Sequence, residues 1–99
     1  MQLITKELEK ILPPLYAQDG KKEKTVYAKL FCPWNNWTWY ILEYSHEEKV
    51  CFGYVIGQDS EYGYFSIPEL ESINYRGLGI ERDFNFQPCK LSELIKNKY

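Results

Sequence analysis

The aromatic side chains are the residues of this sequence whose type and spacing point most directly to a binding chemistry. Six of the fourteen residues from Phe31 to Tyr44 are aromatic, and all three tryptophans are among them. Exposed Trp and Tyr side chains offer a large contact area with few rotatable bonds, which suits protein-binding hot spots, and they can also stack unpaired bases. The candidate binding residues are Trp34, Trp37, Trp39, Tyr40, Tyr44, Tyr62 and Tyr64.

Four acidic residues form a second candidate site: Glu69, Glu71, Glu81 and Asp83. A nuclease-like metal site needs two or more carboxylates that converge on one divalent cation. Glu69 and Glu71 lie two apart on a predicted helix and do not share a face, whereas Glu81 and Asp83 lie two apart on a predicted strand and do. No third ligand, serine elbow or phosphate-binding loop motif accompanies them. We therefore predict no catalytic residue, no metal site and no cofactor.

Lysines supply the third candidate site. Lys21, Lys22 and Lys24 lie in the first polar loop, and Lys96 and Lys98 lie at the C-terminus. If they gathered at one end of a sheet, they could hold phosphates beside its aromatic face. The whole chain carries 12 basic and 14 acidic residues, for a net charge of −2. A whole-protein electrostatic footprint for nucleic acid is therefore absent.

The cysteines and the N-terminal segment indicate the compartment. Cys32, Cys51 and Cys89 form no CxxC pair, and the single His46 does not complete a zinc-binding pattern, so we predict free, buried or half-buried thiols. The segment MQLITKELEKILPP has no apolar stretch long enough for a signal peptide, and no window approaches a membrane span. We expect a cytoplasmic protein that does not bind a membrane.

Hydrophobic periodicity predicts the elements that must position these residues. Helical spacing ends at Pro13, while Ser66 as N-cap with Glu69 three residues on is typical of a helix start. Gly53 and Gly57 indicate a bulge or a close approach of neighbouring side chains. The predicted order is α-β-β-β-β-α-β-α: helix 3–12, strands 25–31, 36–44, 50–57 and 62–66, helix 68–73, strand 80–86 and helix 91–98.

The short links between strands favour a mostly antiparallel sheet, so we predict an α+β fold with about five strands in a single domain over residues 1–99. Within strand 36–44, alternation places Trp37, Trp39 and Ile41 on one face. The opposite face receives Thr38, Tyr40, Leu42 and Tyr44. Both faces are largely apolar, so each is either core or a surface reserved for a partner. We expect Trp37 and Trp39 to lie in the core. For Tyr40 and Tyr44 both a core and a surface position are open, because their phenol hydroxyls favour contact with water.

Several sequence blocks, in a fixed order, resemble one known family. They are LPPLYA (12–17), NWTWY (36–40), FGYVIG (52–57), GYFSIPELE (63–71), IERD (80–83) and LSEL (91–94). Together they are similar to a small bacterial family catalogued as domain of unknown function 2958, from about Leu12 to Leu94. The resemblance implies a gene carried by plasmids, integrative elements and phages, with no established reaction. Genes of this size on mobile elements are often counter-defence factors, such as anti-restriction or anti-CRISPR proteins.

The leading hypothesis is a non-enzymatic binding protein of a mobile genetic element that inhibits a host protein or ribonucleoprotein of a defence system. The alternative is a sheet-based module that binds single-stranded DNA or RNA through the same rings and the lysines. The second alternative is a metal-dependent nuclease built on the four acidic residues. A homodimer is also open, because a second copy could close an exposed aromatic face.

Overall fold

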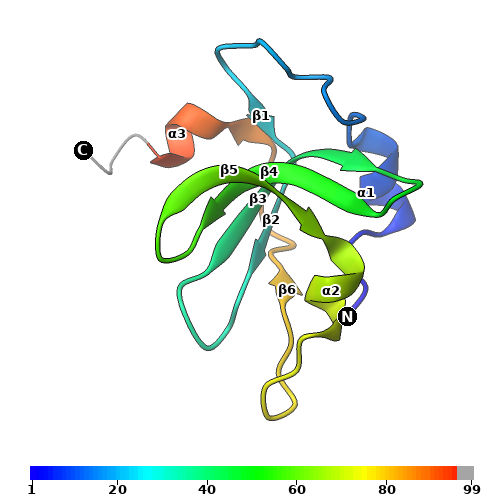
Figure 1. The fold of residues 1–99 in the computed structure, drawn as a ribbon, viewed down its shortest axis with the longest axis vertical. Helices are drawn as coiled ribbons and strands as arrows, with labels where there is room; N and C mark the ends of the chain where they lie inside the picture. The colour runs from blue at the N-terminus through cyan, green and yellow to red at the C-terminus, as the bar shows by residue number, and fades with distance from the viewer. Residues whose placement is uncertain (96–99) are drawn as a thin grey trace.

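A five-stranded antiparallel sheet in the order β5-β4-β3-β2-β6 forms the centre of the computed structural model, which describes residues 1–95 (Figure 1). A second, two-stranded sheet pairs β1 with β7. The strands are β1 (Thr25–Val26), β2 (Ala28–Phe31), β3 (Thr38–Ser45), β4 (Val50–Ile56), β5 (Ser60–Ser66), β6 (Glu81–Arg82) and β7 (Cys89–Lys90). The helices are α1 (Lys6–Ile11), α2 (Ile67–Ser72) and α3 (Leu91–Ile95).

The predicted α+β class and the mostly antiparallel sheet are confirmed, and the differences lie in the bounds. The expected strand 25–31 changes partner at Tyr27, because β1 pairs with the unpredicted β7 while β2 pairs with β3. The expected strand 80–86 ends early, because the Asp83 carboxylate accepts the Asn85 amide at 2.9 Å and turns the chain. The last helix begins at residue 91 as predicted, and residues 96–98 of that prediction lie outside the described part of the chain.

Side chains near the helix starts explain where α1 and α2 begin. The Thr5 hydroxyl accepts the Leu8 amide at 3.2 Å, so α1 begins later than the predicted residue 3. The Ser66 hydroxyl accepts the Glu69 amide at 3.3 Å, and Pro68 lies in the first turn of α2. The N-cap predicted from the sequence is therefore confirmed.

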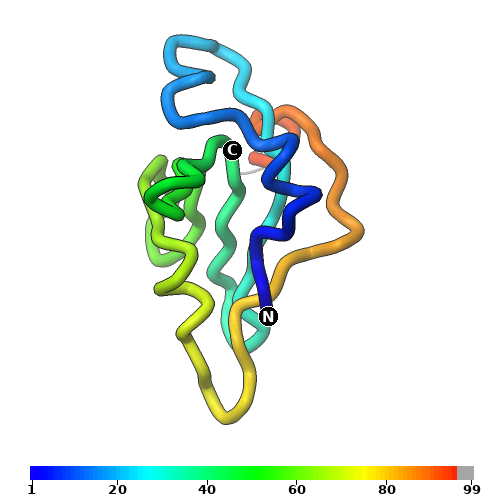
Figure 2. The backbone as a smooth tube through the Cα atoms, turned by 90° about the vertical axis from the view of Figure 1, so that its right-hand side faces the viewer, coloured from blue at the N-terminus to red at the C-terminus, as the bar shows by residue number. Residues whose placement is uncertain are grey.

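The sheet has an inner face, which we define by Leu30, Trp39 and Ile41, and an outer face opposite it. The N-terminal segment and α2 cover the inner face, and Figure 2 shows that segment running alongside the strands. On the outer face, α3 and the segment before it cover only part of the sheet, around Tyr40 and Leu42. The buried inner-face cluster contains Leu3, Ile4, Leu8, Leu12, Ala28, Leu30, Cys32, Trp39, Ile41, Tyr44, Cys51, Ile67, Leu70 and Ile80.

A bulge in β3 changes which side chains share a face. Ile41 pairs with Gly53, but Glu43 pairs with Phe52, so Leu42 is an extra residue on β3. Strict alternation fails at such a point, because the chain gains one residue without a partner. The prediction that Tyr44 shares a face with Tyr40 is therefore wrong: Tyr44 packs in the inner-face cluster, and Glu43 turns to the outer face.

The two glycines of the third predicted strand mark close approaches, as expected. A Cβ atom on Gly53 would lie 2.0 Å from the Tyr40 carbonyl oxygen, beside the bulge, and one on Gly57 would lie 2.5 Å from the Trp37 ring. The three cysteines are free thiols, two buried and one half-buried, as predicted. Within residues 1–95, no helix is both long and apolar enough to cross a membrane.

Candidate binding surfaces

The structure divides the seven predicted binding residues into three groups. The tryptophans 34, 37 and 39 lie at the end of the sheet where β2 and β3 are joined. Tyr40 and Tyr44 are in the core, on opposite faces. Tyr62 and Tyr64 lie on the outer face of β5, at the edge of the sheet. The single aromatic surface expected from the sequence is thus two separate surfaces with buried rings between them.

Tyr40 and Tyr44 are core residues, with only 8% and 6% of their surface exposed. The Tyr40 ring packs 6.2 Å from the Phe86 ring, between centroids, and burial raises the pKa of its phenol. Burial also raises the pKa of the Tyr44 phenol, and the charge of Glu9 adds to that effect. The choice that the sequence left open for these two residues is therefore resolved in favour of the core.

The first surface is a tryptophan groove of about 250 Å³ at the β2–β3 end of the inner face. Trp37 is its most accessible ring, with 39% of its surface exposed, whereas Trp39 is buried beside it at a centroid distance of 6.0 Å. Trp34 is half-buried and packs against Tyr75 at 5.3 Å. The groove is lined by Cys32, Trp34, Asn35, Trp37, Trp39, Ile73 and Ile80.

A second hollow of about 400 Å³ lies on the other side of Trp37 and Trp39, toward β5. Val55 and Phe65 provide its apolar wall, and Asp59 and Glu61 border it. Trp37 therefore stands between two hollows. A ring in that position can insert into a partner while the partner fills the space on either side.

The Trp37 side chain is held in place by its own turn and by a glycine. The Asn35 side-chain oxygen accepts the Trp37 amide at 2.9 Å, and the Trp37 carbonyl accepts the Cys32 amide at 3.0 Å. The ring lies where a side chain at position 57 would be, so Gly57 makes room for it. Trp37 itself precedes β3, which begins at Thr38 and not at the predicted residue 36.

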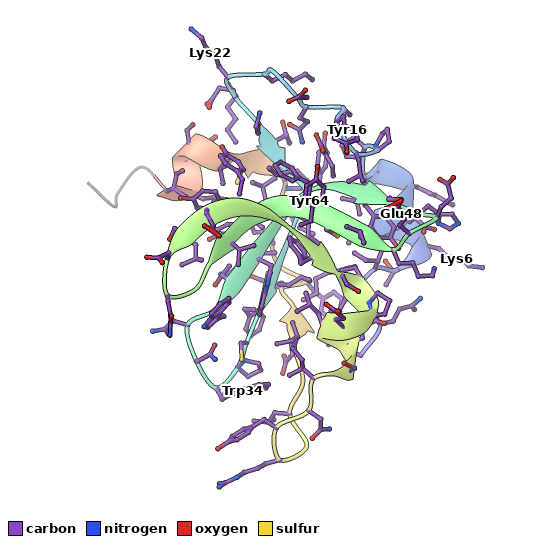
Figure 3. All side chains as sticks on the ribbon, viewed as in Figure 1. Lys6, Tyr16, Lys22, Trp34, Glu48 and Tyr64 are labelled. Atoms are coloured by element: carbon purple, nitrogen blue, oxygen red, sulfur yellow. The ribbon has the colours of Figure 1, made fainter. Side chains whose placement is uncertain are left out.

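The second surface is a tyrosine cleft of about 270 Å³ on the outer face. Its rings come from Tyr16, Phe52, Tyr62 and Tyr64, and the three tyrosines are exposed. Phe52 stacks on Tyr62 at 5.9 Å between centroids, with the ring planes 6° apart, and approaches Tyr64 at 5.0 Å. Figure 3 shows Tyr16 above Tyr64. The interaction with Tyr16 is the largest cause of the raised pKa of the Tyr64 phenol.

Two buried polar side chains form the floor of this cleft. Glu43 is 3% exposed and Gln18 is 4% exposed. The two carboxylate oxygens of Glu43 accept the backbone amides of Tyr16 at 2.8 Å and of Gln18 at 2.7 Å. The Gln18 side chain in turn donates to the carbonyls of Thr25 and Leu42, both at 2.9 Å, and accepts the Thr25 amide at 2.6 Å.

Sequence reasoning missed both of these floor residues. A signal for Glu43 was present, because an acid within the apolar run YILEY is costly to bury and needs hydrogen-bond donors. Gln18 gave no such signal, since a glutamine in a polar loop is ordinarily solvated.

Within residues 1–95, none of the predicted lysines lines the tryptophan groove. Figure 3 shows Lys22 and Trp34 at opposite ends of the molecule. Lys24 borders the tyrosine cleft, but its ammonium donates to the carbonyls of Gln18 at 3.1 Å and Lys21 at 2.9 Å. The Lys24 side chain therefore fixes the loop before β1. Lys96 and Lys98 lie outside the described residues.

The four acidic candidates are dispersed, and two of them bind backbone amides. Glu71 accepts the Leu3 amide at 2.9 Å, and Asp83 accepts that of Asn85. Glu81 lies in β6, opposite Phe31, and Glu69 lies exposed in α2. Over residues 1–95, no three His, Cys, Asp or Glu side chains group where they could hold a metal ion.

These features describe a small α+β protein whose antiparallel sheet carries two aromatic surfaces, a tryptophan groove and a tyrosine cleft, at different ends. The chain belongs to the family described as protein of unknown function DUF2958, whose sequence pattern matches residues 3–97. The resemblance noted in the sequence is thereby confirmed. Comparison with curated proteins and with solved structures gives no match.

Proposed function

We propose that this protein acts by binding, and that the tryptophan groove receives an apolar segment of a partner protein. The observation that carries this proposal is Trp37, a partly exposed ring held between two hollows by its own turn and by Gly57. Tryptophans in such settings contribute most of the binding free energy of protein interfaces. A preorganised ring also loses little conformational entropy when the complex forms.

The lining of the two hollows favours a protein over a nucleic acid. Among the described residues, neither hollow is lined by Lys or Arg, and Asp59 and Glu61 border the second one. These carboxylates would repel a phosphate backbone, which basic side chains ordinarily neutralise. The single-stranded nucleic-acid alternative thus has less support. The nuclease alternative loses support too, because Glu71 and Asp83 are engaged with backbone amides.

We further propose that the partner is a host protein or ribonucleoprotein of a defence system, met in the cytoplasm. Support for this step comes from the mobile-element setting that the family resemblance implies. A groove of this kind suits an inhibitor, because an inhibitor needs only to occupy a functional surface of its target. Another copy of the chain would be the competing occupant.

The test is capture of partners from host lysate by the tagged protein, with and without nuclease treatment. Three baits are compared: wild type, Trp37→Ala and Phe84→Ala. Phe84 is a matched control, since its ring is exposed but lies outside both hollows. We expect a discrete protein that survives nuclease, is retained by Phe84→Ala, and binds Trp37→Ala about 30-fold more weakly, as at a hot spot.

Two results would contradict the proposal. Equal capture by wild type and Trp37→Ala, with both baits folded by circular dichroism, would remove the groove as the site. A wild-type dimer in sedimentation that Trp37→Ala converts to a monomer would show that a second copy occupies the groove.

A further inference from the structure

The tyrosine cleft offers several ring faces at close spacing around one hollow. Phe52 and Tyr62 stack with nearly parallel planes, Tyr64 also approaches Phe52, and Tyr16 lines the same hollow. Tyr64 is 55% exposed, so its ring is open to a ligand. The face of an aromatic ring carries the negative end of its quadrupole and attracts a cation placed over it.

Two of the three charged side chains that line the hollow are acidic, Asp19 and Glu43, and the third is Lys24. The pKa of the Tyr64 phenol is raised by its interaction with Tyr16, by desolvation, and by the negative charges that include Glu43 and Asp19. Glu23 likewise contributes to the raised pKa of Tyr62, after burial and Tyr54. The cleft therefore combines ring faces with a negative potential.

No cation in the described part of the chain neutralises this potential through an ion pair. Glu43 binds two backbone amides and forms no salt bridge. The one basic residue of the lining, Lys24, directs its ammonium to the carbonyls of Gln18 and Lys21. A carboxylate has about four lone-pair positions, so Glu43 retains acceptor capacity after those two amide bonds.

We infer that the tyrosine cleft is a receptor for a guanidinium group, presented by an arginine side chain of a partner protein. Arginine matches the cleft because its planar, weakly hydrated cation stacks on aromatic rings and pairs with carboxylates. A phosphate or carboxylate ligand would be repelled by Glu43 and Asp19. This inference goes beyond the tryptophan groove, because the groove and the cleft have no lining residue in common. Tyr64 lines both the cleft and the second hollow beside Trp37, so the cleft is tested with an arginine peptide and not by capture of the partner.

The experiment is NMR of the full chain with 13C-labelled tyrosine rings, titrated with the acetylated and amidated tripeptide Gly-Arg-Gly. The control ligand replaces arginine by citrulline, which keeps the shape and removes the charge. We expect saturable shifts of the Tyr16, Tyr62 and Tyr64 rings with the arginine peptide. The citrulline peptide should bind at least about fivefold more weakly than the arginine peptide, since it loses the cation–π attraction.

Variants locate the binding and keep the test independent of folding. Tyr64→Leu and Asp19→Asn change exposed residues, so both should stay folded and bind the arginine peptide more weakly. Tyr75→Leu alters an exposed tyrosine outside the cleft and should bind like wild type. Equal binding of both peptides would overturn the inference, as would wild-type affinity in Tyr64→Leu. Ring shifts with oligothymidylate but not with the arginine peptide would assign the cleft to nucleic acid instead.

Discussion

The Glu43 carboxylate accepts the backbone amide of Gln18 at 2.7 Å, and it can do so because Glu43 follows the extra residue of the β3 bulge. Without that bulge, alternation would point position 43 toward the inner core. The same carboxylate accepts the Tyr16 amide, and Tyr16 has a φ of 73°, in the left-handed region that costs a non-glycine residue about 1 kcal/mol or more. One side chain thus holds the strained segment that supplies a wall of the tyrosine cleft.

Replacing Glu43 by glutamine should destabilise the protein. The amide has one acceptor oxygen where the carboxylate has two, so one of the two backbone amides, of Tyr16 or Gln18, loses its partner. Leaving a buried donor unsatisfied costs about 1–3 kcal/mol in the free energy of unfolding. Urea denaturation measures the change. Glu61→Gln, on exposed β5, is the matched control and should stay within about 0.5 kcal/mol of wild type. Equal effects of the two substitutions would show that Glu43 does not hold the loop.

Replacing Gly57 by alanine should displace the Trp37 ring without touching the tryptophan itself. The new Cβ atom would lie 2.5 Å from a ring carbon of Trp37, so the ring must move. We expect a shifted tryptophan emission maximum and at least tenfold weaker partner binding, about 1.4 kcal/mol. Gly63→Ala is the control for emission, because a Cβ atom there meets nothing within 4 Å. An unchanged spectrum in Gly57→Ala would contradict the proposed support of the ring.

The fold class was predictable from the sequence because its signals are local. Ser66 and Pro68 mark the start of α2 through their own hydrogen bond and backbone angle, and Gly53 and Gly57 mark close approaches through their missing side chains. The alternation of β3 was also predictable up to Ile41. Each of these features depends on one residue and its near neighbours.

The candidate surfaces were less predictable because they depend on contacts between distant residues. The bulge reverses the face of Tyr44, and no residue type at Leu42 announces it. Gln18 is buried only because it reaches Thr25 and Leu42, and β7 is a strand only because β1 lies beside it. Likewise, Tyr62 and Tyr64 follow Trp37 in sequence by fewer than thirty residues, yet the two surfaces occupy different ends of the sheet.

The buried thiol of Cys51 should make the protein less stable as the pH rises above neutral. Burial raises the pKa of Cys51 far above the value of about 8.5 that a thiol has in an unfolded chain. Below about pH 8.5 the thiol is protonated in the folded protein and in the unfolded chain, so its contribution to stability is fully present. Above it, the unfolded chain loses the proton while the folded chain keeps it, which favours unfolding by up to about 1.4 kcal/mol per pH unit.

The measurement is the free energy of unfolding from about pH 7.5 to about pH 9, below the pKa of about 10 that tyrosines have in the unfolded chain. Cys51→Ala should lose stability overall because it leaves a small cavity, but its stability should fall less steeply with pH than that of wild type. Ile41→Val is the control. It also leaves a small cavity in the core, but it adds or removes no titrating group, so its stability should fall with pH as steeply as that of wild type. Cys89, whose pKa is also raised by burial, contributes to the slope that remains in Cys51→Ala. A slope identical in wild type and Cys51→Ala would mean that the Cys51 thiol loses its proton as readily in the folded protein as in the unfolded chain.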